Sequence, residues 1–170
     1  YYEPMLFTHL NAPWEPYLSG PQAMIGNLVY PASNALARVT VLPPADPIAA
    51  MAAVRQYVSE GWGAKRIKQE ITQGQTWARA RGVTLMCTEF GALRVGPDAV
   101  SRQQWLSDTR SGLQSAAIGW TVWDYADVFG IATASNGRVI PGDQAIVPAD
   151  PRNPQRQFDS RVLRALGLMR

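Results

Sequence analysis

The 170-residue sequence has one cysteine and one histidine. A single cysteine cannot form an internal disulfide, and the two residues together cannot supply the three or four ligands of a zinc site. Charged residues make up 17% of the chain, too few for intrinsic disorder, and 46% of the residues are hydrophobic. The composition therefore predicts a packed domain, or a piece of one, without a disulfide or structural zinc.

The chain also lacks a long apolar run and a basic stripe. Its longest uncharged stretch, 16–37, is interrupted by prolines and glycines that a membrane-spanning helix does not tolerate together. The net charge of +3 comes mainly from scattered arginines. We therefore expect neither a membrane nor nucleic acid as a partner. Because the sequence opens at Tyr1 with no methionine and no leader, we expect a processed product or a fragment.

Several catalytic motifs are missing as well. The sequence has no Gly-x-Ser-x-Gly elbow, no Walker motif and no His-Glu-x-x-His. The segment Gly61–Gly63 leads to Arg66, where a dinucleotide-binding fingerprint requires glycine or alanine. These absences argue against triad hydrolases and against nucleotide or nicotinamide enzymes, and we expect no cofactor.

The residue pattern changes near residue 47. Prolines and aromatic residues fill 1–47 without a helical period, which predicts an ordered loop. Beyond it, hydrophobic spacing predicts a short helix over 48–58 and a longer one over 64–81, with Ile67, Ile71 and Trp77 facing the core. Gly82 is expected to end the second helix.

The second half of the chain alternates between β-type and α-type patterns. The expected order is strand, helix, strand and helix, over 83–88, 101–115, 117–123 and 159–166. We expect the first strand to be buried on both faces and Ser101 to cap the helix that follows. The second strand is expected to run into 124–127, followed by a Gly/Pro-rich loop to Pro154. Repeating β–α units predict a parallel sheet, either doubly wound or closed into a barrel.

The number of strands is too small for a complete sheet. Two strands, with the tail of a third at Tyr1 and Tyr2, cannot bury both faces of a parallel sheet. A (β/α)8 barrel usually needs about 250 residues. The predicted fold class is therefore α/β, the C-terminal portion of a (β/α)8 TIM barrel that is incomplete on its own.

Two residues at strand ends are candidates for chemistry. Glu89 directly follows an apolar strand, where barrel enzymes place reactive groups, although a structural glutamate paired with an arginine fits the same position. Trp123 ends the next strand, where an indole can form a flat platform for the apolar face of a sugar. A core tryptophan is the alternative, and it is the preferred interpretation for Trp120.

The opening segment, Tyr2–Trp14, combines aromatic residues, a carboxylate and the single histidine. This mixture suits carbohydrate binding. The alternative is structural: Phe7 and Trp14 fill a gap while His9 bonds to the backbone. Cys87, inside the apolar strand, is most simply a small buried hydrophobic residue.

Three segments together resemble the glycoside hydrolase family 5 cellulases, which share a (β/α)8 fold. Tyr2–His9 with Trp14 resembles the loop after the sixth strand, Thr88–Gly91 the nucleophile motif of the seventh, and Gly119–Asp124 the tryptophan motif of the eighth. The resemblance implies that residues 1–170 are the C-terminal part of a single catalytic domain, from the end of strand 6 through helix 8.

The resemblance also implies roles for individual residues. Glu89 would be the catalytic nucleophile, and Tyr2 the hydroxyl that hydrogen-bonds and orients it. His9, Trp14 and Trp123 would contact the substrate, with Trp123 beneath the sugar at the cleavage point. The sequence departs from the family pattern in one place, since Leu10 and Asn11 replace the usual Gln-Gly.

The acid/base carboxylate of the family is absent. It follows an asparagine in these enzymes, and this sequence has no Asn-Glu pair. The resemblance thus implies half of a retaining site for β-1,4-linked glucan, inactive until an N-terminal part of the barrel, from the same gene or a second chain, supplies the acid. Secretion, or export to the periplasm, is implied only in this way.

Three alternatives stay open. A β-1,3-glucanase, a β-mannanase or a β-glucosidase shares the same scaffold and differs in its loops. A non-catalytic β-glucan-binding protein would use Trp14 and Trp123 for stacking alone. The chain could also be a fragment with no autonomous function.

Overall fold

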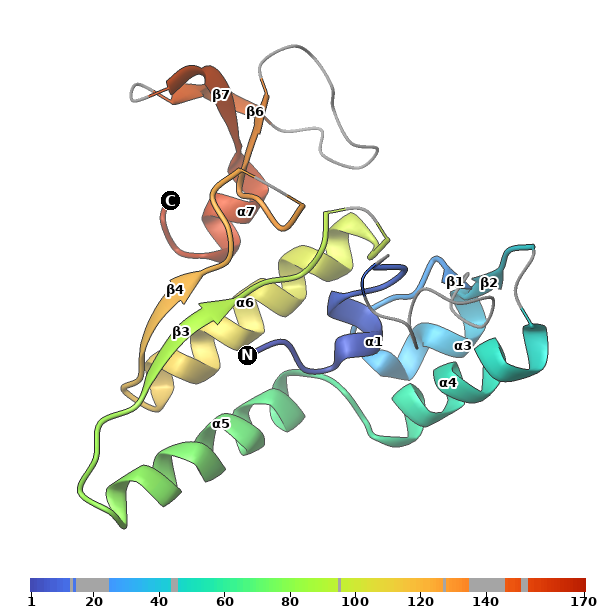
Figure 1. The fold of residues 1–170 in the computed structure, drawn as a ribbon, viewed down its shortest axis with the longest axis horizontal. Helices are drawn as coiled ribbons and strands as arrows, with labels where there is room; N and C mark the ends of the chain where they lie inside the picture. Colours follow the sequence, from blue (N-terminus) through green and yellow to red (C-terminus); the bar gives the residue numbers. More distant parts are fainter. Residues whose placement is uncertain are drawn as a thin grey trace.

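The structure, a computed structural model, describes residues 1–12, 14, 25–43, 46–94, 96–126, 128–134, 146–150 and 153–170. The described chain is mixed α/β (Figure 1). Its long helices and its parallel strands are α4 (Pro47–Ser59), α5 (Ala64–Arg79), β3 (Met86–Phe90), α6 (Ala99–Ser115) and β4 (Gly119–Val122). The three predicted helices over 48–58, 64–81 and 101–115 are confirmed. None of the helices in this described part has the length and apolar character needed to cross a membrane.

Local capping explains where two of these helices begin. The Asp46 carboxylate accepts hydrogen bonds from the backbone of Ile48 and Ala49, and Pro47 occupies the first turn of α4. The prediction that Ser101 caps α6 is wrong. Asp98 is the cap, and its carboxylate accepts the Ser101 N–H at 2.8 Å. An aspartate three residues earlier supplies an equally good acceptor and starts the helix sooner.

Strands β3 and β4 pair in parallel, as predicted, with α6 as the connection between them. Met86 pairs with Gly119 and Phe90 with Val122, and the register shifts between Cys87 and Phe90. The N-terminal segment runs alongside β3, because the Tyr1 amino group donates to the Glu89 carbonyl oxygen at 2.5 Å. The first residue of the sequence therefore meets a strand residue that lies 88 positions further along the chain.

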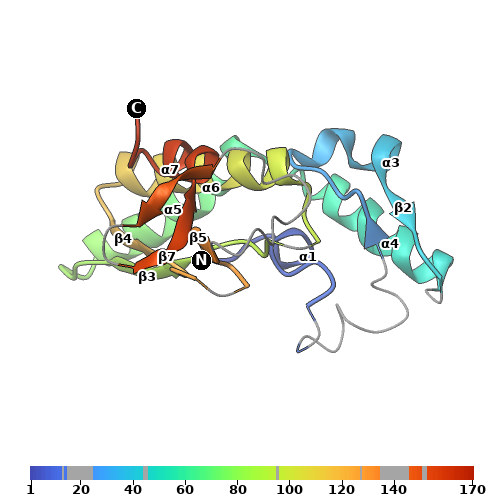
Figure 2. The same ribbon diagram turned by 90° about the horizontal axis from the view of Figure 1, so that it is seen from above.

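The expectation that the first strand is buried on both faces is wrong. Strand β3 starts at Met86 rather than Val83 and alternates between exposed and partly buried residues. Met86 is 58% exposed, and Thr88 and Thr121 are exposed on the same sheet. Helix α6 covers the opposite face (Figure 2). Burial on both faces requires a second layer, and no described element covers the face that carries Thr88 and Thr121.

The first 47 residues contain short elements where a loop was predicted. They are α1 (Met5–Thr8), β1 (Ile25–Gly26), η2 (Ala32–Asn34), α3 (Ala35–Arg38) and β2 (Thr40–Val41), with β1 and β2 antiparallel. These elements are two to four residues long. They are too short to leave a periodic pattern, and buried anchors such as Phe7 and Ile25 hold them.

The loop predicted from residue 128 to Pro154 is wrong in part, and its residues 135–145 and 151–152 lie outside the described residues. It contains β5 (Ala132–Ala134), β6 (Ile146–Asp150) and the start of β7 (Asn153–Asp159), which form an antiparallel sheet in the order β5-β7-β6. Backbone pairing holds these strands, and their residues show little of the alternation that signals a strand. The final helix is confirmed as α7 (Ser160–Ala165), capped by Asp159.

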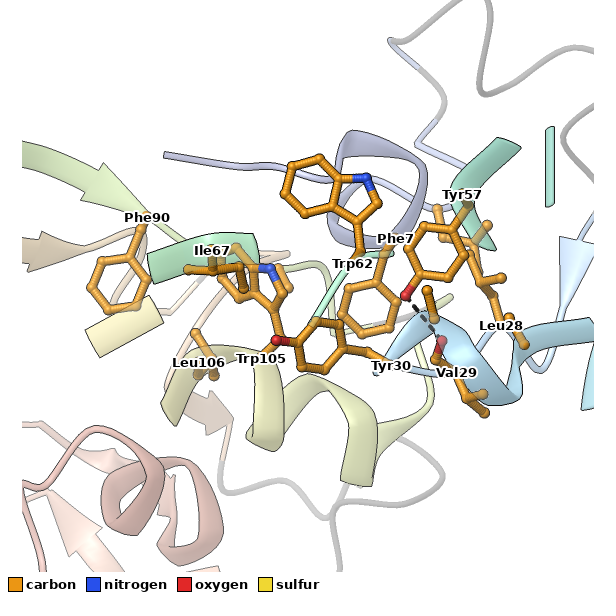
Figure 3. Packing of buried hydrophobic residues seen from close by; sticks show 14 of the residues in the cluster. Phe7, Leu28, Val29, Tyr30, Tyr57, Trp62, Ile67, Phe90, Trp105 and Leu106 are labelled. Atoms are coloured by element: carbon orange, nitrogen blue, oxygen red, sulfur yellow. Dashed lines mark hydrogen bonds between the residues drawn. The ribbon is translucent and has the colours of Figure 1, made fainter. Parts of the chain in front are cut away.

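The core lies between the helices and the parallel strands. Aromatic and aliphatic side chains from the whole described chain contribute, among them Phe7, Tyr30, Tyr57, Ile67, Phe90, Trp105 and Leu106 (Figure 3). Ile67 and Ile71 are buried as expected, whereas Trp77 is 51% exposed and lies beneath the Arg81 guanidinium. Trp77 lies off the buried face of α5, which continues from Ile67 and Ile71 to the fully buried Ala78. Trp120 packs against the core and contacts Phe90 with ring centroids 5.5 Å apart.

Two core tyrosines predict a loss of stability in alkali. The Tyr57 hydroxyl donates to the Val29 carbonyl at 3.0 Å, and Tyr30 donates to Asp108 at 2.8 Å. Burial raises the pKa of both hydroxyls, helped at Tyr30 by the Asp108 carboxylate. Above the ordinary tyrosine pKa of about 10, only the unfolded chain ionises, so each buried tyrosine removes about 1.4 kcal/mol of stability per pH unit.

Urea denaturation at pH 8 and at pH 11 measures this effect. Tyr57→Phe is expected to be less stable than the wild type at pH 8, by about 1 kcal/mol for the lost hydrogen bond. The difference should shrink or reverse at pH 11, because phenylalanine cannot ionise. An equal difference at the two pH values would contradict the explanation.

Candidate functional site

The carboxylate of Glu89 lies at the C-terminal end of β3 and is partly buried. The Tyr2 hydroxyl donates to its Oε2 at 2.6 Å, although the two residues are 87 positions apart. Burial, followed by the hydrogen bond to Glu89, raises the pKa of Tyr2 above its ordinary value. Tyr2 therefore stays protonated through the neutral range and keeps donating to the carboxylate.

The backbone around Tyr2 and Glu89 is held from both sides. The Thr8 hydroxyl donates to the Tyr2 carbonyl at 2.5 Å, and Thr8 itself is fully buried. The thiol of Cys87 donates to the Glu89 carbonyl at 3.3 Å. Cys87 is only partly buried, so the interpretation of it as a core residue is confirmed in part.

Trp123 follows β4 at the same end of the sheet. Its backbone N–H donates to the Phe90 carbonyl at 2.9 Å, which ties the end of β4 to the residue after Glu89. The side chain is 50% exposed, and the peptide bond to Asp124 is cis. The indole is therefore available to a ligand at the strand end that carries Glu89.

Gly91 allows this close packing of the two strand ends. A Cβ atom at residue 91 would collide with the carbonyl oxygen of Trp123 and lie 3.2 Å from the Phe129 ring. Glycine is needed here for the space, since the neighbouring backbone occupies the place of a side chain.

His9 and Trp14 lie on the loop after the N-terminal segment, in different environments. His9 is 6% exposed, and its ring packs edge-on against Tyr2 with centroids 5.0 Å apart. Its Nδ1 lies 2.9 Å from the Thr8 hydroxyl. Trp14 is 48% exposed, so the alternative in which it fills a gap does not hold, whereas Phe7 is fully buried.

Phe129 is a site residue that sequence reasoning missed. It is 4% exposed and packs against three of the predicted residues, with ring centroids 5.8 Å from Tyr2, 5.2 Å from His9 and 6.4 Å from Trp14. The available signal was a lone phenylalanine followed by glycine shortly after the Trp123 motif. With Ala12 and Leu93 it forms a small second core beneath the site.

Leu10 and Asn11 stand where the resembled pattern has Gln-Gly. Asn11 has φ of 60°, in the left-handed region where asparagine is among the few tolerated non-glycine residues. Its side-chain amide donates to the Ile25 carbonyl at 3.1 Å, and Leu10 is buried in the core. The asparagine thus takes the backbone conformation that glycine adopts most easily.

The described part of the chain contains no group of three or more His, Cys, Asp or Glu side chains that could hold a metal ion. The chemistry available is that of the Glu89 carboxylate, kept in place by a phenolic hydroxyl, at the strand end that also carries an exposed indole. A carboxylate so placed can attack an electrophilic carbon or stabilise a cation, and the indole can bind the apolar face of a sugar ring.

Comparison with solved structures identifies the fold. The chain covers 37–38% of several endoglucanase structures while 98% of its own length is matched. Endoglucanase Cel5A from Thermotoga maritima matches with a TM-score of 0.54 and 19% identity, and subunit Z of the clostridial cellulose synthase from Clostridioides difficile with 0.57 and 17%. The chain therefore has the fold of a portion of a (β/α)8 barrel, as predicted.

Sequence comparison points to the same class of proteins. Endoglucanase 3 of Fibrobacter succinogenes is 27% identical over 150 residues, which are 85% of this chain and 22% of that protein. The chain thus spans about a fifth of the relative and less than two-fifths of the matched structures. No protein-family model matches the chain. The predicted resemblance to cellulases is confirmed by these endoglucanases.

Proposed function

We propose that this chain supplies the nucleophile half of a retaining glycoside hydrolase that cleaves β-1,4-linked glucan. The observation that carries the proposal is the 2.6 Å hydrogen bond from Tyr2 to Glu89 at the C-terminal end of a parallel strand. Reactive groups of barrel enzymes gather at this end. The similarity to endoglucanases supports the glucan as substrate.

In the proposed reaction, Glu89 attacks the anomeric carbon and forms a covalent glycosyl-enzyme. Tyr2 orients the carboxylate through its hydrogen bond, and Trp123 carries the sugar at the cleavage point. Trp14, half-exposed on the neighbouring loop, contacts a flanking sugar. His9 contributes mainly by fixing the Tyr2 ring, because its burial leaves it little surface for a ligand.

The acid/base carboxylate comes from the rest of the barrel in this proposal. A retaining mechanism needs a second carboxyl group about 5 to 5.5 Å from the first, to protonate the leaving oxygen and later to activate water. The other strands would continue this sheet from its edges, and their side chains would cover the exposed face of β3 and β4, with residues 1–170 forming the C-terminal part of one catalytic domain. The chain alone is then expected to lack turnover of native glucan.

The substrate and its location follow from the same proposal. Thermotoga maritima Cel5A has been solved with cellobiose and with mannotriose, so mannan belongs beside cellulose and laminarin in any substrate panel. A polymeric glucan is met outside the cytoplasm, which supports a secreted or periplasmic protein.

A mechanism-based label tests Glu89 independently of the missing acid. A 2-deoxy-2-fluoro cellobioside with a good leaving group needs no protonation, so the nucleophile alone can attack it and form a stable ester. We expect an adduct on the tryptic peptide 82–94, in which Glu89 is the single acidic side chain. Fragmentation of the labelled peptide distinguishes an ester at Glu89 from an adduct on the Cys87 thiol, which the same peptide contains.

Tyr2→Phe is the matched variant for this experiment. It keeps the ring that packs against His9 and Phe129 and removes the donor to Glu89, so labelling should slow without moving to another peptide. An adduct on a different peptide would overturn the assignment of the nucleophile. No adduct on the complete protein would favour the glucan-binding alternative.

A further inference from the structure

Arg102 joins the two loops that follow the parallel strands. It lies in the first turn of α6 and is 4% exposed. Its Nε donates to the Ala92 carbonyl at 2.8 Å, and its Nη2 donates to the carbonyls of Phe129 at 2.7 Å and Gly130 at 3.3 Å. One side chain thus connects the segment after Glu89 with the segment after Trp123.

The position of this cation is costly without these contacts. Burial disfavours a charged group, and the N-terminal turn of a helix carries the positive end of the helix dipole. Charge-assisted hydrogen bonds to carbonyl oxygens offset this cost. The guanidinium has five donors in a fixed plane, and a lysine ammonium cannot reach both loops in the same way.

Phe129 links Arg102 to the candidate site. The Phe129 carbonyl oxygen accepts a hydrogen bond from Arg102, and the Phe129 ring packs against the rings of Tyr2, His9 and Trp14. A shift of the Phe129 backbone therefore changes the packing of the Trp14 ring as well as that of the Tyr2 and His9 rings. The Tyr2 backbone is held separately by Thr8.

We propose that Arg102 is a positioning residue for glycan binding, acting through Phe129 on the aromatic residues that flank Glu89. This role rests on the proposed function. Arg102 is expected to affect glycan affinity more than the attack of Glu89 on the sugar. The Tyr2–Glu89 hydrogen bond is supported separately by Thr8 and by β3.

Steady-state kinetics of Arg102→Lys on cellopentaose, in the complete polypeptide, test the proposal. We expect KM to rise about tenfold, the scale of one or two lost charge-assisted hydrogen bonds, with kcat within about twofold of the wild type. The pH–rate profile should keep its shape, since no titrating catalytic group changes.

Arg110→Lys is the matched control. Arg110 also lies on α6 and donates to a carbonyl, that of Ala165 at 2.9 Å, but this bond leads to α7 and away from the site. The KM of Arg110→Lys for cellopentaose should therefore equal that of the wild type. A general loosening of α6 would raise KM in both variants and would overturn the specific role of Arg102.

Phe129→Leu gives an independent readout if Arg102→Lys folds poorly. It leaves the three carbonyl acceptors in place and removes the ring contacts, so it should raise KM to a similar extent. In the double variant, KM should rise by less than the product of the two single-variant increases, because both substitutions act through one contact. Unchanged KM in Phe129→Leu, or fully multiplicative effects, would overturn the proposal. A wild-type protein that neither binds nor cleaves cellopentaose would overturn the proposed function itself, and this role with it.

Discussion

Replacing Glu89 with glutamine is expected to abolish turnover while glucan binding persists. The amide is nearly the same size as the carboxylate and can still accept the Tyr2 hydrogen bond, so the local structure should survive. It cannot act as a nucleophile on the anomeric carbon, and loss of a covalent nucleophile lowers kcat by about 10⁴-fold or more. Activity on cellopentaose and calorimetric titration with the same oligosaccharide separate the two effects.

Glu3→Gln is the control for this change. Glu3 is exposed, lies next to Tyr2, and its carboxylate accepts a hydrogen bond from the Met5 backbone at 3.3 Å. The substitution removes the same charge close to the site and should leave kcat unchanged. If Glu89→Gln kept a tenth of the wild-type activity, Glu89 would not be the nucleophile, and a structural role would be the better explanation.

The long elements of the fold were predictable because their signals are local. Hydrophobic spacing located α4, α5 and α6, and the apolar run before Glu89 located β3. The elements that were missed depend on distant partners. The β5-β7 pair joins Ala132 to Phe158, and α1 is held by the burial of Phe7. Such contacts leave no periodic pattern in the residues that make them.

The burial of the parallel strands was mispredicted for a related reason. An apolar run such as 83–88 indicates a strand that is buried on both faces of a sheet. It does not indicate which elements cover each face. In the described structure α6 covers one face, and Thr88 and Thr121 remain exposed on the other. Their exposure agrees with a chain that matches less than two-fifths of each barrel it resembles.

The candidate site was predictable where motifs exist and hidden where contacts alone define it. The residues Tyr2, Glu89 and Trp123 come from three recognisable segments, and the structure brings Tyr2 and Glu89 within hydrogen-bond distance. Phe129 and Arg102 belong to no motif. Their importance rests on ring packing and on hydrogen bonds to backbone carbonyls, which depend on the path of two loops rather than on residue type.

Gly91→Ala is expected to lower both the stability of the protein and its kcat/KM, and this is the second-largest effect that we predict. The added Cβ would collide with the Trp123 carbonyl, and this backbone cannot easily withdraw because the Trp123 N–H is bonded to Phe90. The Phe129 ring, 3.2 Å from the same Cβ position, blocks the other direction. We expect a loss of about 2–3 kcal/mol in the free energy of unfolding, typical of overpacking. Displacement of Trp123 relative to Glu89 should also lower kcat/KM by about 10²-fold.

Gly74→Ala shows whether this loss is specific to the site. Gly74 lies within α5, and a Cβ there would meet only the Leu85 side chain at the ordinary distance of 3.7 Å. Because alanine is the better helix former, this control should be more stable than the wild type by about 0.5–1 kcal/mol, with unchanged kcat/KM. Urea denaturation and assays on cellopentaose compare the two variants directly. Wild-type stability and activity in Gly91→Ala would mean that the ends of β3 and β4 do not pack as closely as the structure places them, and the proposed position of Trp123 beside Glu89 would then lose its support.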